Sequence, residues 1–420
     1  MQTERELRED FYRRVEKNFQ RLSGDTYAGK NVFREPAYDW PGDWEGRYLL
    51  AGVLLHRLTG RKTAPLSYLL EHLDEHTNEY GYFGKATDGT SVSEQQISGN
   101  GWFLRGLCEY YADFPAPIIR EKIQSIVENL YIKCADLYAR YPVSGTRAQG
   151  GVSGSAVGEN GGWLLSSDVG CAFIALDGLT AAYALFPSAR LKNFIDGCIR
   201  VFLSIDKRGA HMQTHATLTC CRALLRMYRA AKEEAYLARA REVFDLYTAH
   251  GMTLTYENFN WFGREDTWTE PCAVIDSLIA ALDLYDATAL PQYRTLARRI
   301  WLNGFRLCQR DNGGAGTNSC VTKQSGVWSM QMYEAYFCCS MRTAEGLYRA
   351  GQALDLLLAG TDADADRAPV QDECGRWMCG DRLLCSANGG PLAPLPNVSE
   401  IGAEELKKLR LRIVFAAGEK

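Results

Sequence analysis

The alternation of short and long links between helical segments constrains the fold of this chain more than any other feature. Apolar residues recur at helical spacing in twelve segments, and nothing before Gly360 has the pattern of a run of strands. Links after the even-numbered segments are a few residues long, whereas those after the odd-numbered ones are mostly long and rich in Gly, Ser, Asn and aromatic residues. The predicted helices are Thr3–Leu22, Trp44–Leu58, Ala64–His76, Gly99–Ala112, Pro117–Tyr141, Asp168–Phe186, Ala189–Ser204, Thr214–Ala231, Ala235–His250, Pro271–Tyr285, Pro291–Gln309 and Ser340–Leu358.

Twelve helices with alternating links predict an all-α fold, an (α/α)6 barrel over residues 1–360 with the even helices as its inner ring. All long links then lie on one face, where the inner helices begin and where functional loops are expected. Residues 361–420 are predicted to form a short C-terminal extension packed on the barrel. This extension has an acidic start at Thr361–Arg367 and two strand-like segments, Arg376–Cys385 and Leu406–Phe415.

Composition excludes several classes of protein. The net charge of −4 and the lack of a basic aromatic patch argue against nucleic-acid binding. No apolar run approaches membrane-spanning length, and the charged N-terminus does not have the pattern of a secretory signal. Fourteen cysteines without such a signal predict reduced thiols and a cytoplasmic location. The expected partner is a small carbohydrate, with neither nucleic acid nor membrane; the oligomeric state is left open.

Two cysteine-containing segments precede predicted inner helices. Pro271 suits the first helical position, which leaves Glu270 extended and Cys272 in the first turn, where the helix dipole favours a thiolate. Cys338 and Cys339 lie directly before the start of the twelfth predicted helix. Three thiols and one carboxylate suit zinc. A metal ion is the preferred interpretation; a purely structural zinc, or buried cysteines without a ligand, are the alternatives.

These segments resemble the zinc-dependent cysteine glycosidases of glycoside hydrolase family 127, the β-L-arabinofuranosidases. That family has an Asp-Thr-x-x-x-Glu-x-Cys stretch before an inner helix, a later Cys-Cys pair, and an upstream Gly-Glu-x-Phe segment that carries the general acid/base. A family helix that opens with Gly-His-Ala is similar to Thr214-His215-Ala216. The other counterparts are Asp266-Thr267-Trp268-Thr269-Glu270-Pro271-Cys272, one residue shorter, then Cys338-Cys339, and Tyr256-Glu257-Asn258-Phe259.

The resemblance implies a retaining glycosidase that uses zinc, held by Glu270, Cys272, Cys338 and Cys339. Cys338 would be the nucleophile, as a zinc-bound thiolate, and Glu257 would protonate the departing oxygen and later activate water. Aromatic neighbours of Glu257 are expected to desolvate it and raise its pKa. Glu265 is the competing carboxylate for this role.

Further side chains near the starts of inner helices, or in the loop before Pro271, are candidates for binding a sugar. Tryptophans can stack on sugar faces, and polar side chains can bind hydroxyls. Each has a simple structural alternative in the protein core or in a loop hydrogen bond. The candidates are Trp44, Glu45, Asn100, Trp102, Asp168, His215 and Trp261.

The chain also departs from the family pattern. Ser340-Met341-Arg342 follows the Cys-Cys pair where the family commonly has Pro and then Asn, and the chain has little room for the large β-sandwich domains that follow the family's barrel. The sugar is therefore left open: an L-arabinofuranoside or another glycoside. Two other functions remain: a hydrolase or lyase of acidic or unsaturated sugars that uses carboxylates such as Asp168 with a structural zinc, and a non-catalytic glycan-binding barrel.

Overall fold

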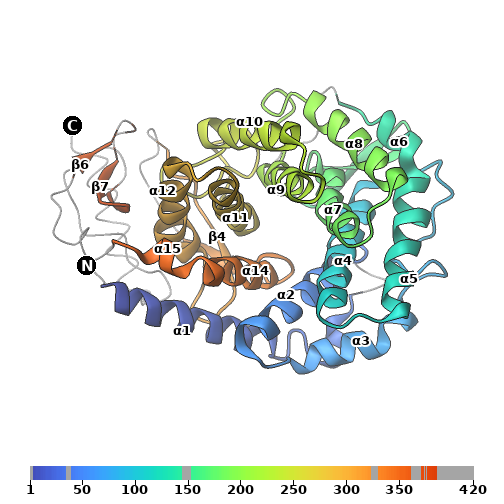
Figure 1. Cartoon of the computed structure of the whole chain (residues 1–420), viewed down its shortest axis with the longest axis horizontal. Coiled ribbons are helices and arrows are strands. Elements are labelled where there is room, and N and C mark those ends of the chain that lie inside the picture. The colour runs from blue at the N-terminus through green and yellow to red at the C-terminus, as the bar shows by residue number, and fades with distance from the viewer. Residues whose placement is uncertain are drawn as a thin grey trace. The chain divides into compact units, whose positions relative to one another are not determined.

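A computed structural model describes residues 3–34, 39–143, 153–322, 330–360, 370–372, 374 and 376–385. The chain divides into two compact units, one made of residues 1–21 and 245–420 and the other of residues 22–244. Helices dominate both units (Figure 1). Among the described residues, no helix combines the length and the apolar character needed to cross a bilayer.

In the unit of residues 22–244, four helices pack one against the next, and they are buried over most of their length. They alternate along the chain with helices that bury one face only, such as α8, where Leu191, Ile195 and Phe202 are buried and Arg190 is exposed. The buried helices are α2 (Asp43–Thr59), α4 (Glu94–Asp113), α7 (Ala175–Leu185) and α9 (Thr214–Ala231). The one-faced helices are α3 (Ala64–His76), α5 (Pro117–Ile126) and α8 (Ala189–Ser204).

In the unit of residues 1–21 and 245–420, the central helix is α11 (Pro271–Thr288), buried from Pro271 to Leu284. It packs against α12 (Pro291–Arg299) and α14 (Cys339–Gln352), as Figure 1 shows. The first helix, α1 (Glu4–Leu22), is one-faced, and α10 (Glu234–His250) crosses the boundary between the units.

All twelve predicted helices are present, which confirms the periodicity argument. Three continue through short 3₁₀, π or α segments: η2 (Val127–Tyr131), η3 (Ile132–Cys134) and α6 (Ala135–Ala139) after α5, η5 (Ile300–Phe305) and α13 (Arg306–Cys308) after α12, and α15 (Leu354–Leu358) after α14.

Two predicted helix starts were wrong. Helix α4 begins five residues before Gly99 because the Ser93 hydroxyl caps it by accepting from the Gln95 N–H. The helix predicted from Asp168 begins as a 3₁₀ turn, η4 (Cys171–Ile174), because Gly170 before it has a left-handed φ of 86°.

The long links contain short strands that the sequence analysis missed. β1 (Val92–Ser93) pairs in parallel with β3 (Trp163–Ser166), which pairs antiparallel with β2 (Ala156–Asn160). β4 (Gly316–Asn318) pairs antiparallel with β5 (Met330–Glu334). Strands of two to five residues are too short for an alternation of apolar and polar residues to be recognised.

The C-terminal region is β-structured where it is described. β6 (Val370–Gln371) pairs with β7 (Trp377–Cys379), which pairs with β8 (Arg382–Cys385), all antiparallel. The predicted single strand Arg376–Cys385 is therefore wrong: it is a hairpin, turned at Gly380 with a φ of 58° that glycine adopts without strain. The predicted segments Thr361–Arg367 and Leu406–Phe415 lie outside the described residues, and the domain boundary at residue 360 stays a prediction.

Buried ion pairs join helices within each unit. Arg342 of α14, whose side chain is fully buried, bonds to Asp276 of α11 and to Glu345 of its own helix. In the other unit, Asp177 of α7 lies 2.8 Å from Arg226 of α9 and 3.3 Å from Arg105 of α4. Such pairs fix the lateral register of neighbouring helices, because an unpaired buried charge is costly.

Candidate metal centre

The first turn of α11 has the geometry that the sequence predicts. Glu270 is the N-cap residue with extended backbone (φ −116°, ψ 113°), Pro271 follows at the first helical position, and Cys272 lies in the first turn. The Glu270 N–H donates to the Asn258 side-chain oxygen over 3.0 Å, which fixes the approach of the chain to the helix.

The start of α14 is held by a tight turn. Cys338 is the N-cap residue, and its N–H donates to the Ala335 carbonyl over 3.3 Å. The Ser340 N–H donates to the same carbonyl over 3.2 Å, and the Ser340 hydroxyl accepts from the Ala315 N–H over 3.0 Å. Serine after the Cys-Cys pair thus ties α14 to the chain just before β4.

Strand β4 lies between the two segments that lead into these helices. On one side, the Thr269 N–H donates to the Asn318 carbonyl over 2.8 Å, and Trp268 forms a bridge with Ser319. On the other side β4 pairs with β5, and the Ala335 N–H extends the ladder to the Ala315 carbonyl over 2.7 Å. One short strand therefore sets the spacing between the starts of α11 and α14.

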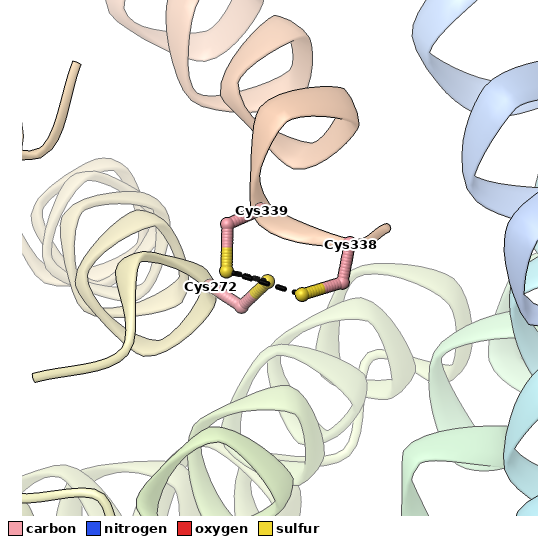
Figure 2. A group of neighbouring side chains, drawn as sticks. All are labelled: Cys272, Cys338 and Cys339. Atoms are coloured by element: carbon pink, nitrogen blue, oxygen red, sulfur yellow. Dashed lines mark hydrogen bonds between the residues drawn. The ribbon is translucent and has the colours of Figure 1, made fainter. Parts of the chain in front are cut away.

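Three cysteine sulfur atoms meet at these helix starts, as Figure 2 shows. The Cys272 Sγ lies 3.3 Å from the Cys339 Sγ, which in turn lies 3.3 Å from the Cys338 Sγ. Cys272 and Cys339 are buried, packed with Ala315 and Ala335, whereas Cys338 is partly exposed. Of the three cysteines, Cys338 is the one that is partly exposed to solvent.

Burial governs the ionisation of this group. It raises the pKa of the Cys339 thiol well above its ordinary value, and the neighbouring sulfur atoms of Cys272 and Cys338 add to the rise. Burial thus outweighs the helix dipole at Cys339. The Cys339 thiol therefore needs a positive charge beside it if it is to ionise near neutral pH.

The residues fit a divalent metal ion. The three sulfur atoms lie within 4.8 Å of one another, and two thiolates at ~2.3 Å from a tetrahedral zinc are about 3.8 Å apart, close to the spacing seen. A carboxylate oxygen of Glu270 lies within 4.8 Å of the Cys272 Sγ, but at that distance it does not join a group with Cys338 and Cys339. A group dominated by sulfur favours zinc over magnesium or calcium.

Glu257 is in a closed polar pocket in the same unit. Its side chain is fully buried, and its carboxylate accepts from the Asn318 amide at 2.5 Å and from the Thr255 and Thr269 hydroxyls at 2.8 and 3.3 Å. Burial raises the pKa of Glu257 to about 7, against the lowering effect of these donors. The competitor Glu265 lies in the same loop.

Trp261, the predicted sugar-binding residue of this unit, is 2% exposed and meets the Trp268 ring edge to face, with centroids 5.4 Å apart. Among the described residues, its indole N–H has no hydrogen-bond partner. The loop from residue 256 to 272 therefore packs its own aromatic residues, and in this conformation Trp261 does not present a face to solvent.

The remaining predicted sugar-binding residues belong to the unit of residues 22–244 and are all buried. Trp102 stacks on His215 with centroids 5.8 Å apart. Trp44 stacks on Tyr27 at 5.1 Å, and Glu45 accepts from the Arg34 N–H over 2.8 Å.

Asn100 and Asp168 bind loops of this unit. The Asn100 side chain accepts from the Phe83 N–H and donates to the Pro41, Phe83 and Gln96 carbonyls, so it anchors two loops. Asp168 accepts from the Ser153 hydroxyl at 2.8 Å and from the Gly154 N–H at 3.0 Å, and burial raises its pKa to about 6.

Comparison with known proteins supports the fold. No protein-family model matches the sequence, and no curated protein matches it. Among solved structures, similar ones include a GH127 β-arabinofuranosidase (12% identity, TM-score 0.51, 80% of this chain and 55% of that one). An unsaturated glucuronyl hydrolase specific for heparin has 12% identity and a TM-score of 0.55 over 83% of this chain and 98% of its own. The cellobiose 2-epimerase of Bacillus thermoamylovorans B4167 has 12% identity and a TM-score of 0.55 over 81% and 97%.

These likenesses confirm the predicted fold class, a mostly helical (α/α)6 barrel with a little β structure at its C-terminal end. The resemblance to family 127 holds at the level of the fold. The chain spans little more than half the length of two glycoside hydrolases that it matches in structure, 58% and 55%.

Two features of the centre escaped the sequence analysis. The Arg342–Asp276 ion pair lies about one helical turn beyond Cys339 and Cys272, on the same two helices. Tyr336 and Phe337, directly before Cys338, are exposed. The aromatic pair is visible in the sequence beside the Cys-Cys pair, but only the structure reveals its exposure.

Proposed function

We propose that this chain is a retaining glycoside hydrolase in which the Cys338 thiolate is the nucleophile. The observation that carries the proposal is the meeting of three sulfur atoms at the starts of α11 and α14, with Cys338 as the partly exposed cysteine. The fold is shared with a β-arabinofuranosidase and other carbohydrate-active enzymes, which supports a glycoside as substrate. A β-L-arabinofuranoside is the first substrate to test, beside other glycosides.

Cys272, Cys338, Cys339 and Glu270 would hold a zinc ion. When bound, such an ion supplies the positive charge that keeps buried thiols ionised and eases the departure of a thiolate. Cys272 and Cys339, both buried, would serve as fixed ligands. Cys338, partly exposed at the N-cap position rather than inside the helix, would be the cysteine that meets a substrate carbon.

The reaction would proceed in two displacements. The Cys338 sulfur forms a bond to the anomeric carbon while the glycosidic C–O bond breaks, and an acid protonates the departing oxygen. A water oxygen then attacks the same carbon, the C–S bond breaks, and the thiolate is restored as a base takes the water proton. Two inversions give net retention.

The test combines metal content with turnover. Purified protein is analysed for zinc by elemental analysis and assayed against 4-nitrophenyl furanosides and pyranosides in both anomeric forms. We expect about one zinc per chain and cleavage of at least one glycoside, with the retained anomer as first product by NMR. An inverted product would contradict a cysteine nucleophile. Cleavage without any bound metal would contradict the metal centre.

We assign to Glu257 the role of acid and base, on the resemblance and on its pKa of about 7, which suits a group that both gives and takes a proton near neutrality. Because Glu257 is fully buried, a substrate oxygen reaches it only when residues packed around it move.

Replacing Glu257 by glutamine is expected to lower kcat by about 10²- to 10⁴-fold and to abolish the fall of kcat/KM as pH rises through about 7.

The protonation of Glu257 also makes the folding stability of the wild-type chain depend on pH. Because the folded pKa lies above that of an unfolded glutamate, the stability that neutral Glu257 contributes is present below pH ~4.5 and is lost as pH rises through about 7, a change of ~3 kcal/mol. Unchanged kcat with a flattened stability profile would make Glu257 a structural residue.

Asp168 supports a second candidate, hydrolysis of unsaturated acidic sugars with a carboxylate as proton donor. Its pKa of about 6 leaves it partly protonated near neutrality, and an unsaturated glucuronyl hydrolase shares the fold. Under this candidate, Asp168→Asn would abolish cleavage of an unsaturated glucuronide while Cys338→Ser would not. Under the cysteine mechanism, Asp168→Asn is expected to change kcat of the cleaved glycoside by less than about tenfold.

A further inference from the structure

Two aromatic residues occupy the centre of the turn that leads into α14. Both backbone groups of Ala335 are hydrogen-bonded. Its N–H donates to the Ala315 carbonyl, and its carbonyl accepts from the N–H groups of Cys338 and Ser340. The bond from Cys338 to Ala335 closes a four-residue turn with Tyr336 and Phe337 as its central pair. Central turn positions usually hold Gly, Pro, Asn, Asp or Ser. Two large aromatic residues here are not explained by turn formation.

The pair is more exposed than the residues on either side of it. Tyr336 is 41% and Phe337 37% exposed, whereas Ala335 before them and Cys339 after them are 3% and 1% exposed. The two rings meet edge to face, with centroids 5.6 Å apart and planes at 79°. A single exposed apolar side chain is common on proteins, but a mutually packed aromatic pair in a pinned turn forms a defined surface.

The position of the pair relative to Cys338 indicates what it would contact. A sulfur nucleophile approaches the anomeric carbon from the side opposite the leaving group. Residues beside the nucleophile therefore lie next to the sugar under attack and away from the departing group. Aromatic faces bind the apolar C–H faces of sugars, and their π electrons favour the positive charge that develops on an oxocarbenium-like transition state.

We propose that Tyr336 and Phe337 form the binding platform for the sugar ring that Cys338 attacks. The ligand class is a neutral monosaccharide unit with an apolar ring face. This inference rests on the proposed glycosidase function and deepens it, since it assigns the recognition of the attacked sugar to two residues next to the nucleophile.

The experiment compares Tyr336→Ala and Phe337→Ala with wild type on one sugar carrying two leaving groups, 4-nitrophenyl and methyl. Because the platform contacts the attacked sugar, kcat/KM is expected to fall about 10- to 100-fold with both leaving groups alike, and Tyr336→Phe is expected to restore most of it. A loss confined to the 4-nitrophenyl substrate would place the pair on the leaving-group side and overturn the proposal.

The matched control is Tyr12→Ala. Tyr12 is an exposed aromatic residue of the outer helix α1, 60% exposed, and it meets the buried Phe11 edge to face at 5.3 Å. It is expected to leave kcat/KM and zinc content unchanged. Unchanged zinc affinity in Tyr336→Ala and Phe337→Ala, which loss of the Cys338 thiol from the centre would weaken, shows that the turn still presents Cys338.

Equilibrium binding separates the platform from the chemistry. Titration calorimetry with L-arabinose and with the free sugars of the other assayed glycosides is expected to give at least tenfold weaker binding for Tyr336→Ala. If wild type cleaves nothing but binds a sugar through the pair, the glycosidase function fails and the platform stands. If both alanine variants bind and cleave like wild type, or wild type binds no sugar, the platform is overturned.

Discussion

Cys338→Ser is expected to lower the turnover of every glycoside that the wild-type chain cleaves by about 10⁴-fold or more. A serine hydroxyl remains protonated under conditions where a thiol in this centre ionises, and removal of a nucleophile typically costs this much. The measurement is kcat for the best 4-nitrophenyl substrate, with zinc content determined on the same sample. Zinc is expected to remain bound, more weakly, because Cys272, Cys339 and Glu270 are unchanged.

Two further variants make this result specific. Cys272→Ser is expected to lower zinc occupancy, since a buried ligand is lost, and activity should fall together with zinc. Cys134→Ser changes a fully buried thiol in the unit of residues 22–244, outside the centre, and is expected to keep both zinc and turnover. If zinc-bound Cys338→Ser keeps more than about a tenth of wild-type turnover, the metal centre serves only to stabilise the fold.

Of the substitutions proposed for this chain, Arg342→Met is expected to lower the free energy of unfolding most, by about 3–5 kcal/mol. The substitution leaves the buried carboxylates of Asp276 and Glu345 without their shared cation. Asp276→Asn should cost less, because Arg342 then retains Glu345 as its counter-charge. Denaturant unfolding at neutral pH measures both values.

The matched control is Arg5→Met, which breaks a surface pair with Glu9 at 3.7 Å between side chains that are 85% and 67% exposed. Water and salt screen such a pair, so the unfolding free energy is expected to stay the same within error. A cost for Arg342→Met no larger than that for Asp276→Asn would show that the two carboxylates do not depend on this arginine. Because the ion pair lies about one turn beyond Cys272 and Cys339, zinc affinity should also fall in Arg342→Met.

Local sequence patterns account for the helices and for the local geometry of the first cysteine segment. Helical periodicity depends on residues three and four apart, so all twelve helices were predictable from local patterns. Pro271 likewise fixes its own φ and restricts Glu270 before it, so the extended cap and the first-turn position of Cys272 followed from neighbouring residues alone. The short strands were missed because two to five residues carry too weak a pattern.

How these local elements present their side chains depends on the packing of distant segments. Strand β4, more than forty residues after Cys272, sets the spacing that lets Cys272 and Cys339 approach to 3.3 Å. Tertiary packing leaves Cys338 partly exposed and Cys339 buried. It also buries Glu257 and leaves Tyr336 and Phe337 exposed. Exposure and ionisation depend on every segment packed around a side chain. They arise from contacts between residues far apart in the chain, which no local pattern records.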